Sequence, residues 1–203
     1  MNNSRGPGSV DQRRLDDLIR RSNAALNPVM TDFVDGGHRR IGEALRGRLP
    51  ADATVQRFLD ELRFMQDYVG TSYRVSQILP AGLTALQRSL GRHFADRGAQ
   101  CAFALPGNAA AWATHAAEAH LCDGAYQIFS IFDESVPQKN LSTARCADLV
   151  VVPPATPLRL TALGIMATKA SASPGKTRVV AHFAHADHPC GPPYDLYSGA
   201  LHD

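Results

Sequence analysis

The residues that decide the fold are ADLVVVPP at 147–154 and PLRLTALGIMA at 157–167, two apolar runs separated by a short turn. They follow AYQIFSIF at 125–132 and precede TRVVAHFAH at 177–185. Short runs rich in β-branched and aromatic residues, bounded by Pro, Gly or Ser, are typical of strands. Upstream, SYRVSQI at 72–78 alternates between apolar and polar residues, which predicts another strand. The last two thirds of the chain therefore predict a sheet.

Helical patterns precede and interrupt these strands. Apolar residues at spacings of three and four predict amphipathic helices up to residue 94, and Asn108 is placed to cap an alanine-rich one. The expected helices span 11–26, 38–49, 55–69, 80–94 and 108–120. One more strand is expected at 99–105, between the last two helices. Helices first, then alternating strands and helices, then a run of strands, is the order of an α+β domain.

Composition limits the class of protein. The chain has 203 residues, of which 44% are hydrophobic, enough for one domain with a sizeable core. Its formal net charge is +2 without a basic block, so we expect no nucleic-acid partner. No apolar run approaches the ~18 residues of a membrane span. Four scattered cysteines without a Cys-X-X-Cys pair indicate reduced thiols in a reducing compartment.

Changes of pattern divide the chain into parts. We expect a flexible leader at 1–10, an N-terminal helical layer at 11–70, a core at 71–190 and a C-terminal tail at 191–203. The leader is polar and lacks the apolar centre of a signal peptide for the general secretory pathway.

Short sequences within this order resemble the core of the mono-ADP-ribosyltransferases of the Arg-Ser-Glu class. They are Tyr73-Arg74, the segment AFALPGN at 102–108 and ADLVVVPP at 147–154, and the resemblance spans about 72–188. It implies an ADP-ribosyltransferase-like split β-sheet core packed against the N-terminal helical layer. Members of that family hold a phosphate of NAD with the Arg of the first core strand, so the resemblance assigns this role to Arg74.

The resemblance also implies that most of the catalytic set is replaced. The family's Ser-Thr-Ser strand end falls on the segment from Ala102 to Ala104, so both serines are alanines here. Alignment through Pro153-Pro154 places Leu149 at the position of the catalytic Glu. Asp148 then lies beside that position.

The chemistry of the family shows what this replacement costs. Cleavage of the bond between nicotinamide and ribose builds positive charge on the sugar, which requires a carboxylate aimed at it. Leu149 cannot supply one. Asp148 can, but adjacent strand residues point to opposite faces, so a β-bulge just before Val150 would be needed to turn it.

Two hypotheses follow. The first is a transferase-like domain that has lost most of its catalytic set and binds a host protein through its cleft. The alternative is an active NAD-dependent mono-ADP-ribosyltransferase that uses Arg74 with Asp148 or Glu134 as its carboxylate.

A polar loop, DESVPQKNLSTARC at 133–146, precedes the strand at 147–154. In the resembled family this loop recognises the target protein, which makes Glu134, Gln138, Lys139 and Asn140 the candidate recognition residues. The chain is most similar to the type III secreted, ADP-ribosyltransferase-like virulence effectors of plant-pathogenic bacteria, such as the XopAI group. This implies secretion into a host cell, a host protein as partner, and NAD as the cofactor to test.

Clusters of His and Cys do not predict a metal site. His182 and His185 are three apart on an expected strand, so they point to opposite faces and cannot readily share an ion with Cys190. His115 and His120 are five apart on an expected helix, which separates them by about 140° around its axis. We therefore expect no metal.

A third hypothesis is a Cys-dependent hydrolase or deamidase. Cys101 or Cys146 would be the nucleophile, with His182 or His185 as the base. This hypothesis requires the fold to bring one such pair into contact.

Overall fold

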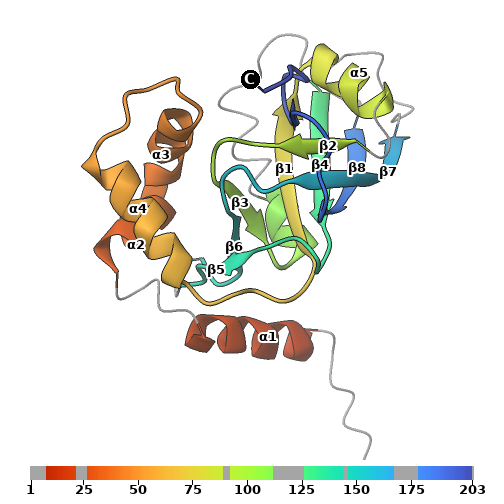
Figure 1. Ribbon diagram of the computed structural model, residues 1–203. Coiled ribbons are helices and arrows are strands. Elements are labelled where there is room, and N and C mark those ends of the chain that lie inside the picture. Colours follow the sequence, from red (N-terminus) through yellow and green to blue (C-terminus); the bar gives the residue numbers. More distant parts are fainter. Residues whose placement is uncertain are drawn as a thin grey trace, which may run out of the picture.

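The computed structural model describes residues 8–21, 27–88, 92–111, 126–143, 146–166 and 178–202. A mixed nine-stranded sheet curls into a half-barrel with helices around it (Figure 1). The strands are β1 (Ser72–Ile78), β2 (His93–Ala95), β3 (Gln100–Phe103), β4 (Tyr126–Phe132), β5 (Lys139–Asn140), β6 (Leu149–Val152), β7 (Leu158–Met166), β8 (Arg178–His185) and β9 (Tyr194–Asp195). Their order is β5-β6-β3-β1-β4-β8-β7-β2-β9, and the described pairs are antiparallel except β4–β8 and β2–β9. The expected α+β class is confirmed.

The helices are α1 (Gly8–Arg21), α2 (Pro28–Asp32), η2 (Phe33–Gly37), α3 (His38–Leu45), α4 (Ala53–Phe64) and α5 (Pro80–Arg88), with a further helical segment at 106–111. The segments from α2 to α4 form a lobe beside the sheet, and α1 lies apart from them below it (Figure 1). Asn27 caps α2 and Asp52 caps α4, each through a side-chain oxygen that accepts backbone N–H groups. The chain bends between α2 and α3 at Gly36, whose φ of 133° is a conformation that glycine adopts readily. None of these described helices is long and apolar enough to cross a membrane.

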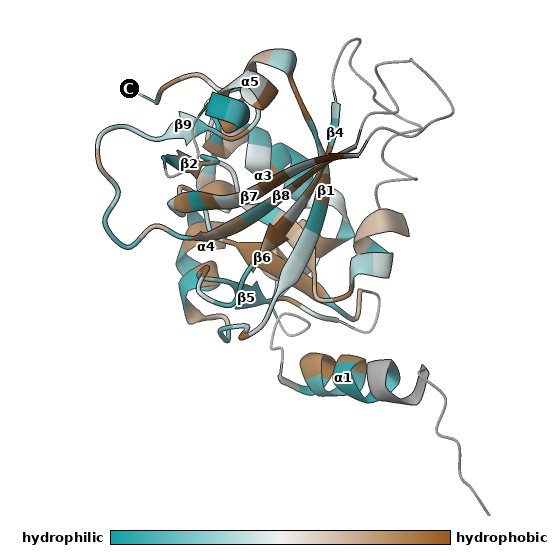
Figure 2. Ribbon diagram, turned by 90° about the vertical axis from the view of Figure 1, so that its right-hand side faces the viewer, coloured by the Kyte–Doolittle hydropathy of each residue, from teal (hydrophilic) through white to brown (hydrophobic). Residues whose placement is uncertain are grey.

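Apolar clusters lie on both sides of the sheet. The inner cluster is enclosed by the curled sheet and α5 and contains Phe94, Phe132 and Phe183. The outer cluster packs the helical lobe against β3 and β6, with the rings of Phe33 and Phe58 stacked at a centroid distance of 4.4 Å. Figure 2 shows the most apolar ribbon along these central strands. β1 therefore has packed side chains on both faces.

Very short strands are the main difference from the sequence-based expectation. The helix expected at 80–94 ends at Arg88, and Phe94 belongs to β2. Phe94 fits the helical spacing of the residues before it, whereas a strand of three residues is too short to show alternation. β2 forms because β7 and β9 supply hydrogen-bonding neighbours on its two sides. The two-residue strands β5 and β9 could not be predicted for the same reason.

Other expected helices also differ in extent. The helix expected at 38–49 ends at Leu45, and the helix expected at 55–69 ends at Phe64. Beyond it the chain is extended and runs beside β5, where the Tyr68 N–H donates to the Gln138 carbonyl at 2.9 Å. The helix expected at 108–120 is described only as far as residue 111, and its remainder lies outside the described residues.

The segment expected to be a C-terminal tail is built into the domain. β9 pairs with β2, and Leu196 is 1% exposed in the inner cluster. The Tyr197 carbonyl accepts the Leu79 N–H at 3.1 Å. It also approaches α5 so closely that a Cβ on Gly82 would lie 2.3 Å from it. Gly82 therefore allows the tail to pack tightly against α5.

A buried ion pair joins the helical lobe to the sheet. Arg46, which follows α3, donates from Nε to Asp96 Oδ1 at 2.8 Å and from Nη2 to Oδ2 at 2.6 Å. Asp96 is fully buried in the turn between β2 and β3, and its Oδ1 also accepts the Gly98 N–H at 2.8 Å. Burial opposes the charge on Arg46, but the hydrogen bonds to Asp96 raise the pKa of Arg46 above its usual value. Two parallel charge-assisted bonds thus fix the lobe against the sheet.

We expect Arg46→Met to lower the free energy of unfolding by about 3–5 kcal/mol, because it leaves the Asp96 carboxylate buried without its charged partner. Arg48→Met is the control. Arg48 is 59% exposed in its ion pair with Glu43, and such surface pairs contribute less than about 1 kcal/mol. Urea denaturation at pH 7 measures both, and equal losses would contradict a special role for the Arg46–Asp96 pair.

Candidate functional site

Strand pairing places Leu149 away from Arg74. Tyr73 pairs with Phe103, and Phe103 pairs with Leu149, so these side chains form one row across β1, β3 and β6. They face the helical lobe, where Leu149 is 5% exposed within the outer cluster. Directly opposed residues of antiparallel strands project to the same side, and their neighbours along the chain project to the other. Leu149 and Arg74 therefore lie on opposite faces of the sheet.

The row that contains Arg74 also contains Ala102 and Val150. Ala102 pairs with Val150, and this row lies next to the row of Tyr73, Phe103 and Leu149. Val150, and not the Leu149 aligned through Pro153-Pro154, therefore shares the face of Arg74. Sequence reasoning missed Val150 because prolines mark the end of a strand but do not fix its register with its neighbours. Both Ala102 and Val150 are fully buried and carry no polar group.

Asp148 shares this face without a β-bulge. The Ala104 N–H donates to the Asp148 carbonyl at 2.9 Å, which continues the regular ladder and sets Asp148 opposite Ala104. Its carboxylate accepts the Leu105 N–H at 3.0 Å and the Asn108 side-chain amide at 2.9 Å. Burial raises the pKa of Asp148, and these two hydrogen bonds partly oppose the rise. The carboxylate is thus held at the start of the helical segment 106–111.

Arg74 is enclosed by groups of its own chain. Its Nη1 donates to the Cys101 carbonyl at 2.6 Å, and its Nε donates to the Tyr197 hydroxyl at 3.1 Å. That hydroxyl in turn donates to Gln100 Oε1 at 3.3 Å. Tyr197 also lies under the guanidinium of Arg46, 5.7 Å from its ring centroid. The C-terminal segment therefore covers the arginine to which the resemblance assigns the NAD phosphate.

Buried hydroxyls surround Arg74 on the same face. Ser72 and Ser76 lie two residues before and after it on β1, and Ser130 pairs with it on β4. Their Oγ atoms are buried and make no hydrogen bond within the described part of the chain. A buried hydroxyl without a partner costs roughly 1–3 kcal/mol. Packing alone does not explain why polar side chains stand around Arg74.

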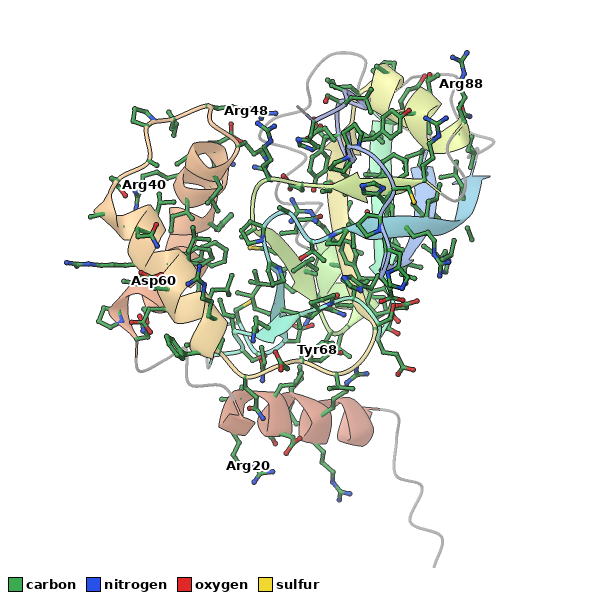
Figure 3. All side chains as sticks on the ribbon, viewed as in Figure 1. Arg20, Arg40, Arg48, Asp60, Tyr68 and Arg88 are labelled. Carbon is green, nitrogen blue, oxygen red and sulfur yellow. The ribbon has the colours of Figure 1, made fainter. Side chains whose placement is uncertain are left out.

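Helix α1 covers the other end of this face. Leu18 packs with Tyr68 against Ala104 and Val150. The Leu18 carbonyl accepts the Asn140 side-chain amide at 2.9 Å, and Figure 3 places Tyr68 between α1 and the sheet. Ala104 and Val150 therefore meet an apolar side chain of α1 on the face of Arg74.

The predicted recognition loop is largely tied to the body of the domain. Gln138 and Asn140 are each 2% exposed, and Gln138 donates to the carbonyls of Gly70 and Asp133. Lys139 donates to the Met65 carbonyl at 3.1 Å and to Asp67 Oδ1 at 2.6 Å. Glu134 is the exposed member of the predicted set.

The structure does not bring together Cys101 and His182, one pair proposed for the Cys-dependent hydrolase. Cys101 lies on β3 and His182 on β8, with β1 and β4 between them, which separates the backbones by about 14 Å. His182 is exposed, whereas Cys101 is buried in the outer cluster. No group of three or more His, Cys, Asp or Glu residues in the described segments could hold a metal. His115 and His120 lie outside the described residues.

No protein-family model and no curated protein matches this sequence. Similarity appears among solved structures. The ADP-ribosyltransferase Vis of Vibrio splendidus in complex with agmatine matches with a TM-score of 0.69 at 17% identity, covering 100% of this chain and 97% of that chain. The C3larvin toxin, an ADP-ribosyltransferase of Paenibacillus larvae, matches at 0.52 and 8% identity, covering 90% and 96%. The ADP-ribosylating toxin BECa of C. perfringens with NADH matches at 0.51 and 9% identity, covering 86% and 45%. Likeness at such low identity establishes that this chain has the ADP-ribosyltransferase fold, as its sequence predicted.

We expect Cys101 and Cys146 to resist alkylation in the folded protein. Burial raises the pKa of each thiol to about 11, so roughly one thiol in a thousand is ionised at pH 8. Exposed Cys190 should react first. Iodoacetamide labelling at pH 8, with and without denaturant and followed by peptide mass spectrometry, measures this order. Fast labelling of Cys101 or Cys146 in the folded chain would support a Cys-dependent enzyme.

Proposed function

We propose that this chain is a secreted bacterial effector that uses an ADP-ribosyltransferase fold to bind a host protein rather than to transfer ADP-ribose. The observation that carries the proposal is the row of Arg74, Ala102 and Val150. This row offers one cation and no carboxylate, and the Asp148 carboxylate of the same face is already held by the Leu105 N–H and the Asn108 amide.

The residues of this face fit only part of NAD. Arg74, with the buried hydroxyls of Ser72, Ser76 and Ser130, has the chemistry to bind a phosphate. The remainder of the face does not fit the nicotinamide ribose, because Val150 supplies no charge and Leu18 covers it. Two donors of Arg74 are already used by Tyr197 and Cys101. We therefore derive no catalytic step through NAD.

An exposed apolar surface supports the protein-binding part of the proposal. Phe64 is 78% exposed and Val69 is 82% exposed. Phe64 ends α4, and Val69 lies in the extended segment that runs beside the predicted recognition loop, where Asp67 pairs with Lys139. Large apolar side chains that remain exposed are typical of protein contact sites.

One observation favours the alternative of an active enzyme. Asp148 shares the face of Arg74, and burial raises its pKa, as in many catalytic acids. Its two hydrogen bonds at the start of segment 106–111 give it a structural role as well. Measurement of NAD turnover separates these roles.

We expect the full chain to show no saturable heat with millimolar NAD by calorimetry and no hydrolysis of a fluorescent NAD analogue. The physical reason is that the row of Arg74 lacks a carboxylate, Asp148 is held by Leu105 and Asn108, and the face is covered from both ends. Leu18→Asp tests whether the covering of this face by α1 prevents turnover. The substitution places a charge against Val150 and should detach α1. Arg13→Asp, on the exposed side of α1, is the matched control.

Absence of turnover in all three proteins supports the proposal. Turnover by any of them would overturn it, and its loss in Asp148→Asn would then establish the enzymatic alternative.

We expect Phe64→Ser combined with Val69→Ser to abolish capture of a host protein that the full chain retains from host-cell extract. Both side chains are exposed, so the free energy of unfolding should change by less than about 1 kcal/mol. Arg57→Ser, at an exposed position of α4, is the control. Capture that survives the double substitution would place the contact elsewhere.

A further inference from the structure

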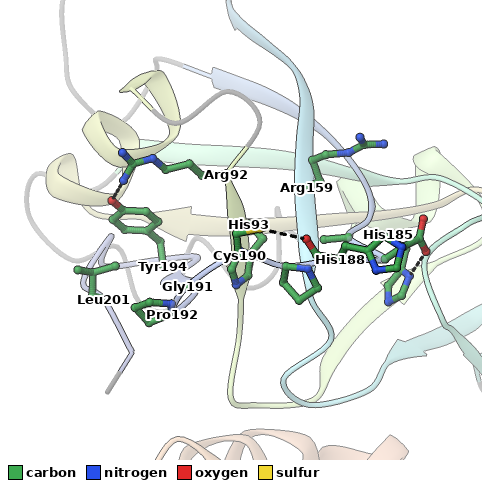
Figure 4. Close-up of a pocket in the computed structure, with 13 residues that line it drawn as sticks. Arg92, His93, Arg159, His185, His188, Cys190, Gly191, Pro192, Tyr194 and Leu201 are labelled. Carbon is green, nitrogen blue, oxygen red and sulfur yellow. Dashed lines mark hydrogen bonds and ion pairs between the residues drawn. The ribbon is translucent and has the colours of Figure 1, made fainter.

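A cavity lies on the sheet away from Arg74. Its volume is about 700 Å³, and it opens where β2 and β7 begin and β8 ends, beside the loop that leads to β9 (Figure 4). Its lining includes Arg92, His93, Arg159, His185, Asp187 and Tyr194. Pockets for small molecules occupy roughly 300–1,000 Å³ in proteins. The cavity is large enough for a ligand and takes no part in the function proposed above.

The cavity is rich in cationic side chains. Arg92 and Arg159 line it, and neither makes an ion pair with a carboxylate of the described residues. The carboxylate of the lining, Asp187, is bound to His185 at 3.0 Å. The pocket therefore has two arginines without an ion pair to a described residue and one carboxylate that is bound to a histidine, and such a pocket attracts anions.

His93 forms a buried polar floor. It is 7% exposed. On the sheet it pairs with Arg159, so these two side chains belong to neighbouring strands of the cavity wall. An imidazole N–H at this position can donate a hydrogen bond to an anionic group in the cavity.

Arg92 is held in place for binding. It donates a hydrogen bond to the Tyr194 hydroxyl, and its guanidinium lies 5.6 Å from the centroid of the same ring. Tyr194 is itself fixed by Phe94, with ring centroids 5.8 Å apart. A guanidinium fixed in this way loses less entropy when it binds a ligand than a free side chain does.

The cations stand at opposite ends of the cavity. Figure 4 shows Arg92 with Tyr194 and Leu201 at one end, Arg159 and His185 toward the other, and His93 between them. In this arrangement an anion bound at one arginine leaves the other available for a second anionic group. We propose that this cavity binds an extended organic phosphate, a small molecule that carries an anionic group at each end.

The size of the cavity favours a small molecule over an acidic peptide, because a volume of about 700 Å³ lies within the range of small-molecule pockets. The prolines of the loop, Pro189 and Pro192, give the wall a fixed apolar surface against which a carbon skeleton packs.

The test compares three probes on the full chain by calorimetry at low salt. Fructose 1,6-bisphosphate should bind at least roughly tenfold more tightly than fructose 6-phosphate, since each charge-assisted contact to Arg adds this much or more. Fructose should not bind. Arg159→Gln should remove the advantage of the second phosphate, whereas Arg88→Gln, at an exposed position of α5, should leave it unchanged. Thermal unfolding confirms that each variant is folded.

Equal affinity for the two sugar phosphates would overturn the two-ended site, and so would an advantage that survives Arg159→Gln. An acidic tetrapeptide of Asp and Glu that binds where the bisphosphate does not would also overturn it and would assign the cavity to a protein partner. NAD is absent from all these measurements, so their outcome is independent of the function proposed for the face of Arg74.

Discussion

Cross-strand pairing between Tyr73 and Phe103, and between Phe103 and Leu149, determines which side chains can face Arg74. Side chains alternate between the two faces of a strand, so a shift of one residue moves a whole set from one side of the sheet to the other. In this register Val150 shares the face of Arg74, and Leu149 packs against the helical lobe. The chemistry open to this chain depends on that register more than on any single residue.

The chain covers its own candidate site from both directions. Leu18 of α1 packs on Val150, and the Tyr197 hydroxyl accepts a hydrogen bond from Arg74. Transfer of ADP-ribose requires polar groups that are already oriented toward the charge that develops. Around Arg74 the groups of this kind include Ser72 and Ser130, which are buried without partners in the described chain, and Asp148 on the same face is held by its own hydrogen bonds. The same fold can host binding or catalysis, because activity depends on the residues placed in the site and not on the architecture.

The Arg46–Asp96 pair links this site to the helical lobe. Asp96 anchors Arg46 from the turn between β2 and β3, and Arg46 in turn lies over the Tyr197 ring. A displacement of the lobe would therefore disturb the covering of Arg74. By contrast, the cationic cavity around Arg92 and Arg159 is formed by the opposite ends of β2 and β7 and the loop before β9. The two regions use different side chains of the same sheet, so a ligand at one need not compete with a partner at the other.

The sequence by itself determined the long elements and the fold class. β1, β4, β7 and β8 were predictable because each contains at least seven residues, enough to display apolar alternation or a β-branched run. The sequence also showed the Tyr73-Arg74 pair and the alanines at 102 and 104. The identity of a residue is known from the sequence, whatever the residue contacts in the fold. Only the tertiary structure decided the short strands, the register of β6 and the covering of Arg74 by Tyr197. These features depend on contacts between residues far apart in the chain, such as Arg74 with Tyr197. The spacing of residues along a short segment cannot predict such contacts.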